Sequence, residues 1–326
     1  MALLEVRNLV TEFGGRHPVR AVNDVSFSLE RGKVLGLVGE SGSGKSVTGF
    51  SIMGLLDRPG RVASGSIIFD GMELTTLDPL RMRKLRGKRI AMVFQDPMMT
   101  LNPVLTIGTQ MTEAIHAHEQ VSREEAYRRS REALALVGIP SPEERMAAYP
   151  HQFSGGMRQR VAIAIALLHK PDLIIADEPT TALDVTIQGQ IVAEFQKLAE
   201  NFNTAVIWVT HDLALVSRIA DDIAVMYTGR LVETGSVEQV LGDPRHPYTK
   251  GLMLSVPSEN RRGERLKQIP GMTPPANRLP KGCSFRTRCD RATQACTELP
   301  PLAAEGERAY RCFHPIYLAA GMGGES

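Results

Sequence analysis

The sequence predicts an α/β fold with a largely parallel sheet, and three observations support this prediction. Short, mostly apolar runs at residues 33–38, 90–94, 173–176, 205–209 and 223–227 have the length of buried strands. Helix-like segments separate these runs, and buried strands that alternate with helices build parallel sheets. Polar residues follow directly after several runs, at the edge where α/β proteins place their functional groups.

The composition is that of an ordinary globular protein and excludes two classes of function. Of the 326 residues, 43% are hydrophobic and 23% are charged, and a net charge of +2 is too small to argue for a nucleic-acid partner. The longest apolar run, residues 161–168, is far shorter than the roughly 20 residues that cross a bilayer. The amino terminus lacks the apolar core of a signal peptide. We expect a protein of the cytosol or of its membrane surface.

Residues 3–38 alternate in the manner of strands, and residues 66–71 end in an Asp-Gly turn that is typical of a hairpin. Phe13 stands in this region, directly before two glycines. An aromatic ring upstream of a phosphate site could stack on a base, because every base offers a π-face. The spacing alone leaves a position in the core of the sheet equally open.

A glycine-rich loop follows the first buried run and leads into a helix-like segment. Its pattern, G-x-x-x-x-G-K-S, lets successive backbone N–H groups converge on phosphate oxygens, and the positive end of the next helix adds to the attraction. Lys45 would reach the β- and γ-phosphates, and the Ser46 hydroxyl would bind Mg²⁺. We predict a nucleoside triphosphate site formed by Gly39, Glu40, Ser41, Gly42, Ser43, Gly44, Lys45, Ser46 and Val47.

Residues from about 98 to 165 change to a helical pattern, which predicts a helical subdomain inserted in the α/β core. Its last helix opens with Ser154, Gly155 and Gly156, and such an end offers free N–H groups and a hydroxyl to a phosphate. One ATP does not need two cradles for its phosphates. We therefore predict that the second cradle serves the nucleotide of another subunit, in a dimer that closes over ATP.

Polar side chains at strand ends complete the predicted chemistry. Asp177 follows four apolar residues and is placed to hold Mg²⁺, while Glu178 can direct a carboxylate at the attacking water. His211 and Gln95 end two other buried runs. Each of these residues alone could be an ordinary polar group at a strand end. Their combination with the phosphate loop favours catalysis.

In this order the motifs resemble those of the ATP-binding cassette (ABC) family, over residues 1 to about 240. The signature departs from the commonest form at Phe153 and Met157. The resemblance implies a P-loop NTPase core of the RecA-like type with an antiparallel β subdomain, and it implies ATP hydrolysis. It implies that Ser46, Gln95 and Asp177 bind Mg²⁺ and that Glu178, His211 and Gln95 act in hydrolysis. It also implies nucleotide contacts by Phe13, Ser154, Gly155, Gly156, Gln159 and, in the motif Ala182-Leu183-Asp184, by Asp184.

More narrowly, the chain resembles the ATPase subunits of bacterial dipeptide and oligopeptide importers, through residues 153–160, 180–186 and 245–249. The resemblance implies a second and often non-identical ATPase subunit, two membrane permeases and, indirectly, an extracytoplasmic binding protein. It implies a peripheral position on the cytoplasmic face of the inner membrane. Importers of nickel, glutathione-like or opine cargo are one alternative. A soluble cassette ATPase is another, although the chain lacks a long coiled-coil insertion and a second cassette, and we expect no nucleic-acid partner.

Residues 241–326 are predicted to form a separate extension, rich in proline, that carries four cysteines. The spacing Cys283-x5-Cys289-x6-Cys296-x15-Cys312 leaves zinc, an iron–sulfur cluster and free thiols open. Some of the importer ATPases that this chain resembles hold a [4Fe-4S] cluster at such cysteines, so the resemblance implies one here. Because the predicted ATP residues precede residue 212, we expect the loss of a cysteine to leave nucleotide binding intact.

Overall fold

The computed structural model describes residues 2–15, 18–181, 183–255 and 268–317. The chain divides into two compact units that interleave along the sequence. The first unit comprises Met1–Leu4, Leu29–Val34 and Ile68–Val209, and the second comprises Glu5–Ser28, Leu35–Ile67 and Thr210–Ser326. The division does not fall at residue 240, where the sequence places the start of the extension. The phosphate loop and the extension belong to the same unit.

The first unit is built around three parallel strands whose residues are almost all buried. Burial on both faces requires apolar side chains at successive positions, which explains the uninterrupted apolar runs in the sequence. Trp208 is fully buried, and Phe195 packs edge-on against it with ring centroids 5.1 Å apart. The strands and the helix that carries Phe195 are β6 (Ile90–Val93), β7 (Leu173–Asp177), β8 (Ala205–Thr210) and α7 (Val185–Phe202).

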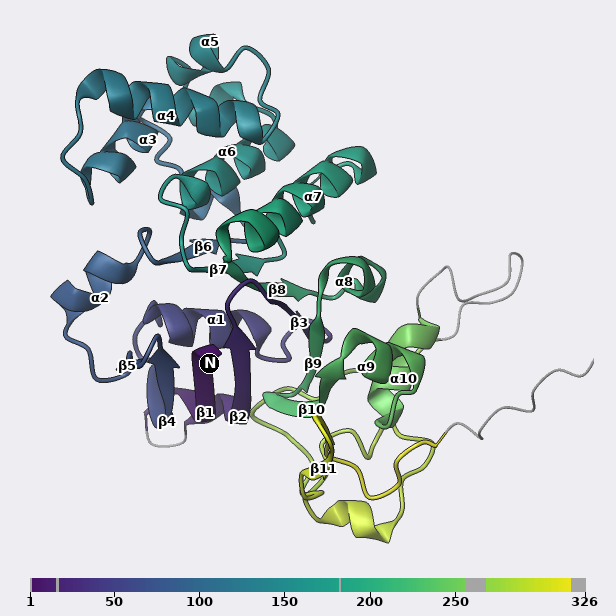
Figure 1. Ribbon diagram of the computed structural model, residues 1–326. Helices are drawn as coiled ribbons and strands as arrows, with labels where there is room; N and C mark the ends of the chain where they lie inside the picture. Colours follow the sequence, from purple (N-terminus) through teal and green to yellow (C-terminus); the bar gives the residue numbers. More distant parts are fainter. Residues whose placement is uncertain (1, 16–17, 182, 256–267, 318–326) are drawn as a thin grey trace, which may run out of the picture. The chain divides into compact units, whose positions relative to one another are not determined.

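Helices gather in the part of the first unit for which the sequence predicts a helical subdomain, and Figure 1 shows α3, α4 and α6 lying together. Side-chain caps begin several of them, because Thr106, Ser122 and Ser154 each accept a hydrogen bond from an N–H three residues ahead. Between Pro97 and Leu167 the structure shows the helical elements η1 (Pro97–Met99), α3 (Ile107–His116), α4 (Arg123–Leu136), α5 (Pro142–Met146), η2 (Pro150–Gln152) and α6 (Gly155–Leu167). The same unit holds β5 (Met72–Glu73) and α2 (Pro79–Leu85).

The second unit contains the strand before the phosphate loop, β3 (Val34–Val38), which pairs in parallel with β9 (Asp222–Tyr227). β9 then pairs with the antiparallel strand β10 (Arg230–Ser236). A second sheet has the strand order β2-β1-β4, formed by β1 (Ala2–Phe13), β2 (Val19–Glu30) and β4 (Arg61–Phe69). The helices of this part are α1 (Lys45–Met53), α8 (Leu213–Ile219) and α9 (Val237–Gly242).

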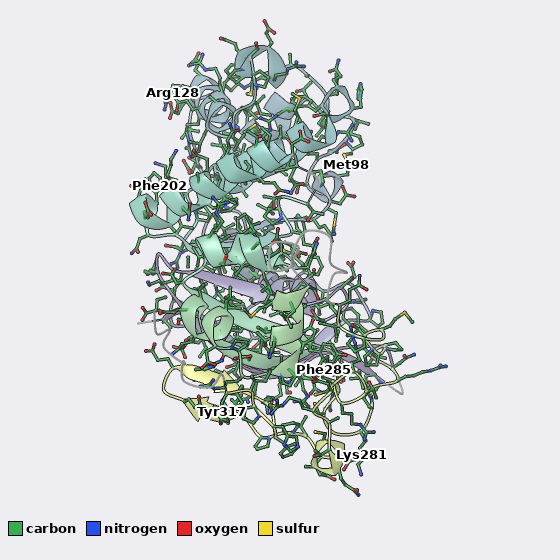
Figure 2. All side chains as sticks on the ribbon, turned by 90° about the vertical axis from the view of Figure 1, so that its right-hand side faces the viewer. Met98, Arg128, Phe202, Lys281, Phe285 and Tyr317 are labelled. Carbon is green, nitrogen blue, oxygen red and sulfur yellow. The ribbon has the colours of Figure 1, made fainter. Side chains whose placement is uncertain are left out.

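The extension completes the sheet of the second unit instead of standing apart from it. Its hairpin, β11 (Ala303–Glu305) and β12 (Arg308–Tyr310), adds to β10 through β12. The buried carboxylate of Glu233 on β10 binds the guanidinium of Arg308 and accepts hydrogen bonds from the N–H groups of Arg245 and His246. A buried carboxylate needs such partners. Two further elements of the extension are α10 (Pro247–Leu254) and η4 (Gln294–Thr297), and Figure 2 labels Lys281, Phe285 and Tyr317 in this region.

Within the described ranges, no helix combines the length and the apolar character that a membrane span requires.

Candidate nucleotide site and cysteine site

The phosphate loop joins β3 to α1, and its glycines are required by the surrounding backbone. Gly39, Gly42 and Gly44 have φ angles of 154°, 77° and 101°. A Cβ atom at Gly39 would lie 2.2 Å from the carbonyl oxygen of Met226, and one at Gly44 would lie 2.4 Å from that of Ala21. Side chains therefore cannot be accommodated there without moving the backbone. The loop is a closed cradle whose walls are the neighbouring strands of the second unit.

Lys45 is fixed by the loop that it serves. Its side chain is buried, and Nζ donates hydrogen bonds to the carbonyl oxygens of Gly39 at 2.8 Å and of Glu40 at 3.0 Å. The ammonium therefore lies beside the first two residues of the loop, at the positive end of α1. The predicted residues differ in exposure: Ser41 and Gly42 are exposed, Ser46 and Val47 are half-buried, and Ser43 is buried.

Two other predicted residues belong to the same unit. Phe13 is half-buried at the end of β1, and a Cβ atom at Gly60 would lie only 2.5 Å from its ring. The ring therefore packs closely over the backbone at Gly60. His211 is exposed in the turn before α8, where the carboxylate of Asp212 caps the helix by accepting from the N–H of Leu215.

The first unit brings two of the predicted catalytic residues together. Asp177 is buried at the end of β7, and Glu178 follows it with a φ of 45°, a conformation that is rare for a non-glycine residue. The N–H of Glu178 donates to the carbonyl oxygen of Val209 at 2.9 Å, which holds this backbone. Its Oε2 accepts hydrogen bonds from Thr181 Oγ1 at 3.0 Å and from Gln95 Nε2 at 3.4 Å. Gln95 and Glu178 thus meet near the ends of the adjacent strands β6 and β7.

The predicted second cradle is an open helix end. Ser154 caps α6 and is exposed, with Oγ accepting from the N–H of Met157 at 3.3 Å. A Cβ atom at Gly155 would meet no atom within 4 Å, and Gly156 is half-buried.

Asp184 is exposed just before α7, and its carbonyl oxygen accepts from the N–H of Gln188.

Gln159 differs from the rest of this motif. Its side chain is only 1% exposed, and its Nε2 donates to the carbonyl oxygen of Phe94 at 3.3 Å. The helix turns this side chain inward, so we do not include it among the surface groups that could touch a nucleotide of another subunit. Ala182, which belongs to the motif around Asp184, lies outside the described residues.

The four cysteines converge on one cavity in the second unit. All four line one small cavity of about 10 Å³, together with His246, Phe285 and several other residues. The segments of Cys283 and Cys296 are joined by a backbone hydrogen bond of 3.0 Å. The sulfurs of Cys289 and Cys312 accept hydrogen bonds from the N–H groups of Arg291 and His314, at 3.4 and 3.3 Å. None of the four forms a disulfide.

The cavity is lined by aromatic side chains, Phe285 and Phe313, and by the arginines Arg286 and Arg291. Burial raises the pKa of the Cys312 thiol to about 11 and raises the pKa of Cys283 and Cys289 above the usual value. Burial lowers the pKa of His246 to about 3. Its Nδ1 accepts a hydrogen bond from the N–H of Tyr248, which requires that this nitrogen carries no proton. Arg286 and Arg291 line the same cavity. Thiolates held there would face compensating charge.

The extension contacts the phosphate loop, and no motif in the sequence indicates this contact. Arg288 donates to both carboxylate oxygens of Glu40, with Nη1 2.6 Å from Oε2 and Nη2 2.9 Å from Oε1. Thr273 Oγ1 lies 2.5 Å from Oε2, and the N–H of Glu40 donates to the hydroxyl oxygen of Tyr248 at 2.8 Å. The Arg288 guanidinium holds the pKa of Glu40 below its usual value. No local pattern could have revealed a contact between residues 248 positions apart.

Comparison with known proteins agrees with this site. The ABC transporter family profile matches residues 22–181. Similar solved structures include a dimeric ATP-binding cassette in a post-hydrolysis state bound to ADP and Pi, with 29% identity and a TM-score of 0.66 over 72% of this chain and 98% of that one. The cassette CbiO1 of Clostridium perfringens shows 26% identity and a TM-score of 0.62, over 74% and 91% of the two chains. The fold and the site thus define an ATP-binding cassette ATPase, which confirms the predicted fold class.

The relatives narrow this class. The oligopeptide transport ATP-binding protein OppD of Escherichia coli is 48% identical over 97% of this chain and 94% of its own length. The dipeptide transport ATP-binding protein DppD of Haemophilus influenzae is 46% identical over 97% and 96%. The profile of the C-terminal region of oligopeptide/dipeptide transporters matches residues 232–296. The chain belongs to the family of oligopeptide/dipeptide ABC transporter ATP-binding proteins, as its sequence motifs predict.

Proposed function

We propose that this ATPase drives the import of di- or oligopeptides as one of two ATPase subunits bound to two membrane permeases, on the cytoplasmic face of the inner membrane. The observation that carries the proposal is the combination of a closed phosphate cradle with a second, open cradle. Similarity to the two peptide transport proteins over nearly the full length, including the extension, favours peptides over nickel, glutathione-like or opine cargo. It also favours a transporter over a soluble cassette ATPase.

In hydrolysis, we assign the phosphates of ATP to the loop at the start of α1, with Lys45 on the β- and γ-phosphates. Mg²⁺ supplies neutralisation of phosphate charge when it is bound, and Ser46, Gln95 and Asp177 would hold it. The described residues contain no group of three or more histidine, cysteine or acidic side chains that could hold a single ion. Mg²⁺ does not need such a group, because one or two carboxylates, phosphates and water satisfy its coordination. The donor set therefore fits.

Glu178 is the proposed general base. Its carboxylate already accepts hydrogen bonds from Gln95 and Thr181, which orient it toward a water molecule that it would deprotonate. We assign His211 to the γ-phosphate and Phe13 to the base. The left-handed backbone of Glu178 supports its role as the general base, because strained conformations cluster at catalytic sites.

The open cradle supports the dimer. Ser154, Gly155 and Gly156 present N–H groups and a hydroxyl at an exposed helix end, where no other part of this unit covers Gly155. We assign this end and Asp184 to the ATP held by the phosphate loop of the second subunit. The dimeric state of a solved relative supports this arrangement.

We further propose that Cys283, Cys289, Cys296 and Cys312 hold a [4Fe-4S] cluster. Four thiols that line one small cavity, N–H groups directed at two sulfurs and nearby arginines suit an anionic group held by all four cysteines. The cluster would crosslink loops that have little apolar core of their own.

A pull-down from detergent extract tests the transport assignment. The full chain should recover integral membrane permeases and a second ATPase, and growth of a deletion strain on single peptides should identify the cargo. Recovery of ribosomes or DNA without membrane proteins would contradict it. Glu178→Gln tests the chemistry, since turnover should fall by about 10²- to 10⁴-fold while ATP binding is retained. Turnover within a few-fold of the parent protein would remove Glu178 from its role.

The cluster has a separate test. Protein purified without exposure to air should be brown and contain about four irons and four sulfides per chain. Cys289→Ser should remove the colour. Stoichiometric zinc without iron in such protein would overturn the cluster and leave the ATPase assignment intact.

A further inference from the structure

The extension holds Glu40, the second residue of the phosphate loop, by both its backbone and its side chain. The N–H of Glu40 donates to Tyr248, and its carboxylate binds Arg288 and Thr273. The side chain of Arg288 is only 4% exposed and also donates through Nε to the carbonyl oxygen of Pro270 at 2.9 Å. The Glu40 side chain is half-buried, and a bidentate arginine–carboxylate pair with a buried arginine fixes geometry more strongly than a fully exposed ion pair. The first peptide of the loop therefore has a position set by the extension.

This position matters for the phosphate site itself. The carbonyl oxygen of Glu40 accepts hydrogen bonds from Lys45 Nζ at 3.0 Å and from the N–H of Ser43 at 3.2 Å. Lys45 is the cation of the site, and Ser43 is a member of the glycine-rich loop. A displacement of Glu40 would move the acceptor that positions the Lys45 ammonium. Misplacement of a positioned charge by a fraction of an ångström to 1 Å has large effects in such sites.

The same segment borders the cysteine cavity. Arg288 directly precedes Cys289, and Phe285, which lines the cavity, packs against Tyr227 and Tyr248 with ring centroids 5.3 and 5.4 Å away. Arg288 Nη1 also lies 3.3 Å from the hydroxyl of Tyr227. These rings are buried and closely packed. These contacts offer a route by which a change in the loops around the cavity would reach the groups that bind Glu40.

We propose that Arg288 and Tyr248 are positioning residues for ATP, which act through Glu40, and that the state of the cysteine site sets the nucleotide affinity through them. The second part rests on the proposed cluster. Coupling between two binding sites is reciprocal. If a cluster at the cysteine site increases the affinity for nucleotide by some factor, then bound nucleotide increases the affinity for the cluster by the same factor. The sequence alone suggests that the extension and the ATP site are independent, whereas this proposal couples them.

Calorimetric titration of the full chain with Mg-ADP tests the first part. Arg288→Met should weaken ADP binding about tenfold, since a charged hydrogen bond that orders the loop is lost. Tyr248→Phe, which removes one acceptor and keeps the ring, should weaken it about threefold. Arg245→Met is the matched control, because Arg245 also binds carboxylates, Asp243 and Glu305, and lies over the ring of Tyr317. Its ADP affinity should stay within about twofold of the parent protein.

A double-mutant cycle separates positioning from general destabilisation. Glu40→Gln combined with Arg288→Met should bind ADP about as weakly as either single variant, because both changes break the same contact. Urea unfolding of each variant shows whether it is folded. Additive losses, or equal losses in Arg245→Met and Arg288→Met, would overturn the positioning role. So would an unchanged affinity in folded Tyr248→Phe and Arg288→Met.

Iron and sulfide test the second part. Protein reconstituted anaerobically with both should bind ADP more tightly than the same protein before reconstitution, and Arg288→Met should lose this difference. An equal gain in the variant, or no gain in the parent protein that has taken up iron and sulfide, would overturn the link. If no iron and sulfide are taken up, the proposed cluster fails together with this link, while the Arg288 and Tyr248 titrations still decide the positioning role.

Discussion

The two predicted phosphate-binding sites of this chain rely on the same interactions, but only one of them is enclosed by its own unit. In both, a glycine-containing turn presents backbone N–H groups at a helix N-terminus. The loop before α1 is closed, since Gly39 and Gly44 lie against strand backbone, Lys45 bridges the entrance and the extension holds Glu40. The end of α6 is open, since Ser154 is exposed and a Cβ atom at Gly155 would meet no atom of the described residues within 4 Å. A cradle completed by its own unit can bind nucleotide alone, whereas an open one depends on a ligand brought by another molecule.

The largest expected effect comes from blocking the open cradle. Ser154→Arg should reduce ATP trapping in a dimer by more than about 100-fold at the site whose phosphate loop lies on the other chain, because it removes a donor and fills the approach. Mixed dimers with one mutated chain, assayed with labelled ATP, measure this. Loss confined to the site with the mutated chain's own Lys45 would reverse the comparison. Ser154→Ala is the mild variant, which costs about 1 kcal/mol of helix capping.

The closed cradle should fail by itself when its cation is removed. Lys45→Ala should weaken the binding of ATP to the monomer by about 10- to 100-fold, since charge-assisted hydrogen bonds to the phosphates are lost. Calorimetry on the isolated chain measures the affinity. Unchanged binding would mean that the loop does not hold the phosphates as proposed.

A matched pair of glycines sharpens the contrast further. Gly44→Ala should lower the free energy of unfolding by about 2 kcal/mol or more, because Ala is strained at a φ of 101° and its Cβ would meet the oxygen of Ala21. Gly155→Ala should change it by less than about 0.5 kcal/mol, since its Cβ meets no atom. Urea unfolding compares them. Equal losses of stability would show that the two cradles do not differ in this way.

The smallest effect concerns the pH dependence of the closed cradle. Arg288 lowers the folded-state pKa of Glu40 below its ordinary value of 4.5, so the stabilisation is fully present above that value and is lost as pH falls through the lower one. Unfolding curves of the parent protein and Glu40→Gln should therefore differ by a constant amount, at most about 1 kcal/mol, from pH 8 to 6. The difference should shrink below about pH 4.5. A difference that grows on acidification would contradict this ion pair.

The sequence was most informative where function depends on neighbours in the chain. The phosphate loop, the carboxylates at the end of β7 and the capped start of α6 follow local rules of turn, strand and cap, and the structure has the expected strands and helices around them. It was harder to predict which side chains point into the core and which point outward. Gln159 lies one turn into α6, in a helix that is apolar on nearly every side, so periodicity could not show that its side chain is buried.

Long-range contacts were beyond the sequence altogether. The proline-rich composition of the extension predicts an appendage, and only the fold shows that β12 pairs with β10 and that Arg288 meets Glu40. A salt bridge between distant residues leaves no periodic or spacing signal, because either partner alone is an ordinary charged residue.

The pairing of Glu40 with Arg288 also has a consequence for the order of events during synthesis. At roughly 5 to 20 residues per second, the ribosome needs roughly 10 to 50 s to add the 248 positions that separate them. During that time the loop has emerged without its anchor. The carboxylate of Glu233 likewise precedes its partner Arg308, by 75 positions. A nascent chain that stops early would keep an acidic group in the sheet with no counter-charge and would be costly to fold. A chain truncated before Arg288 would therefore lack the contacts that hold both Glu40 and Glu233, before any nucleotide is bound.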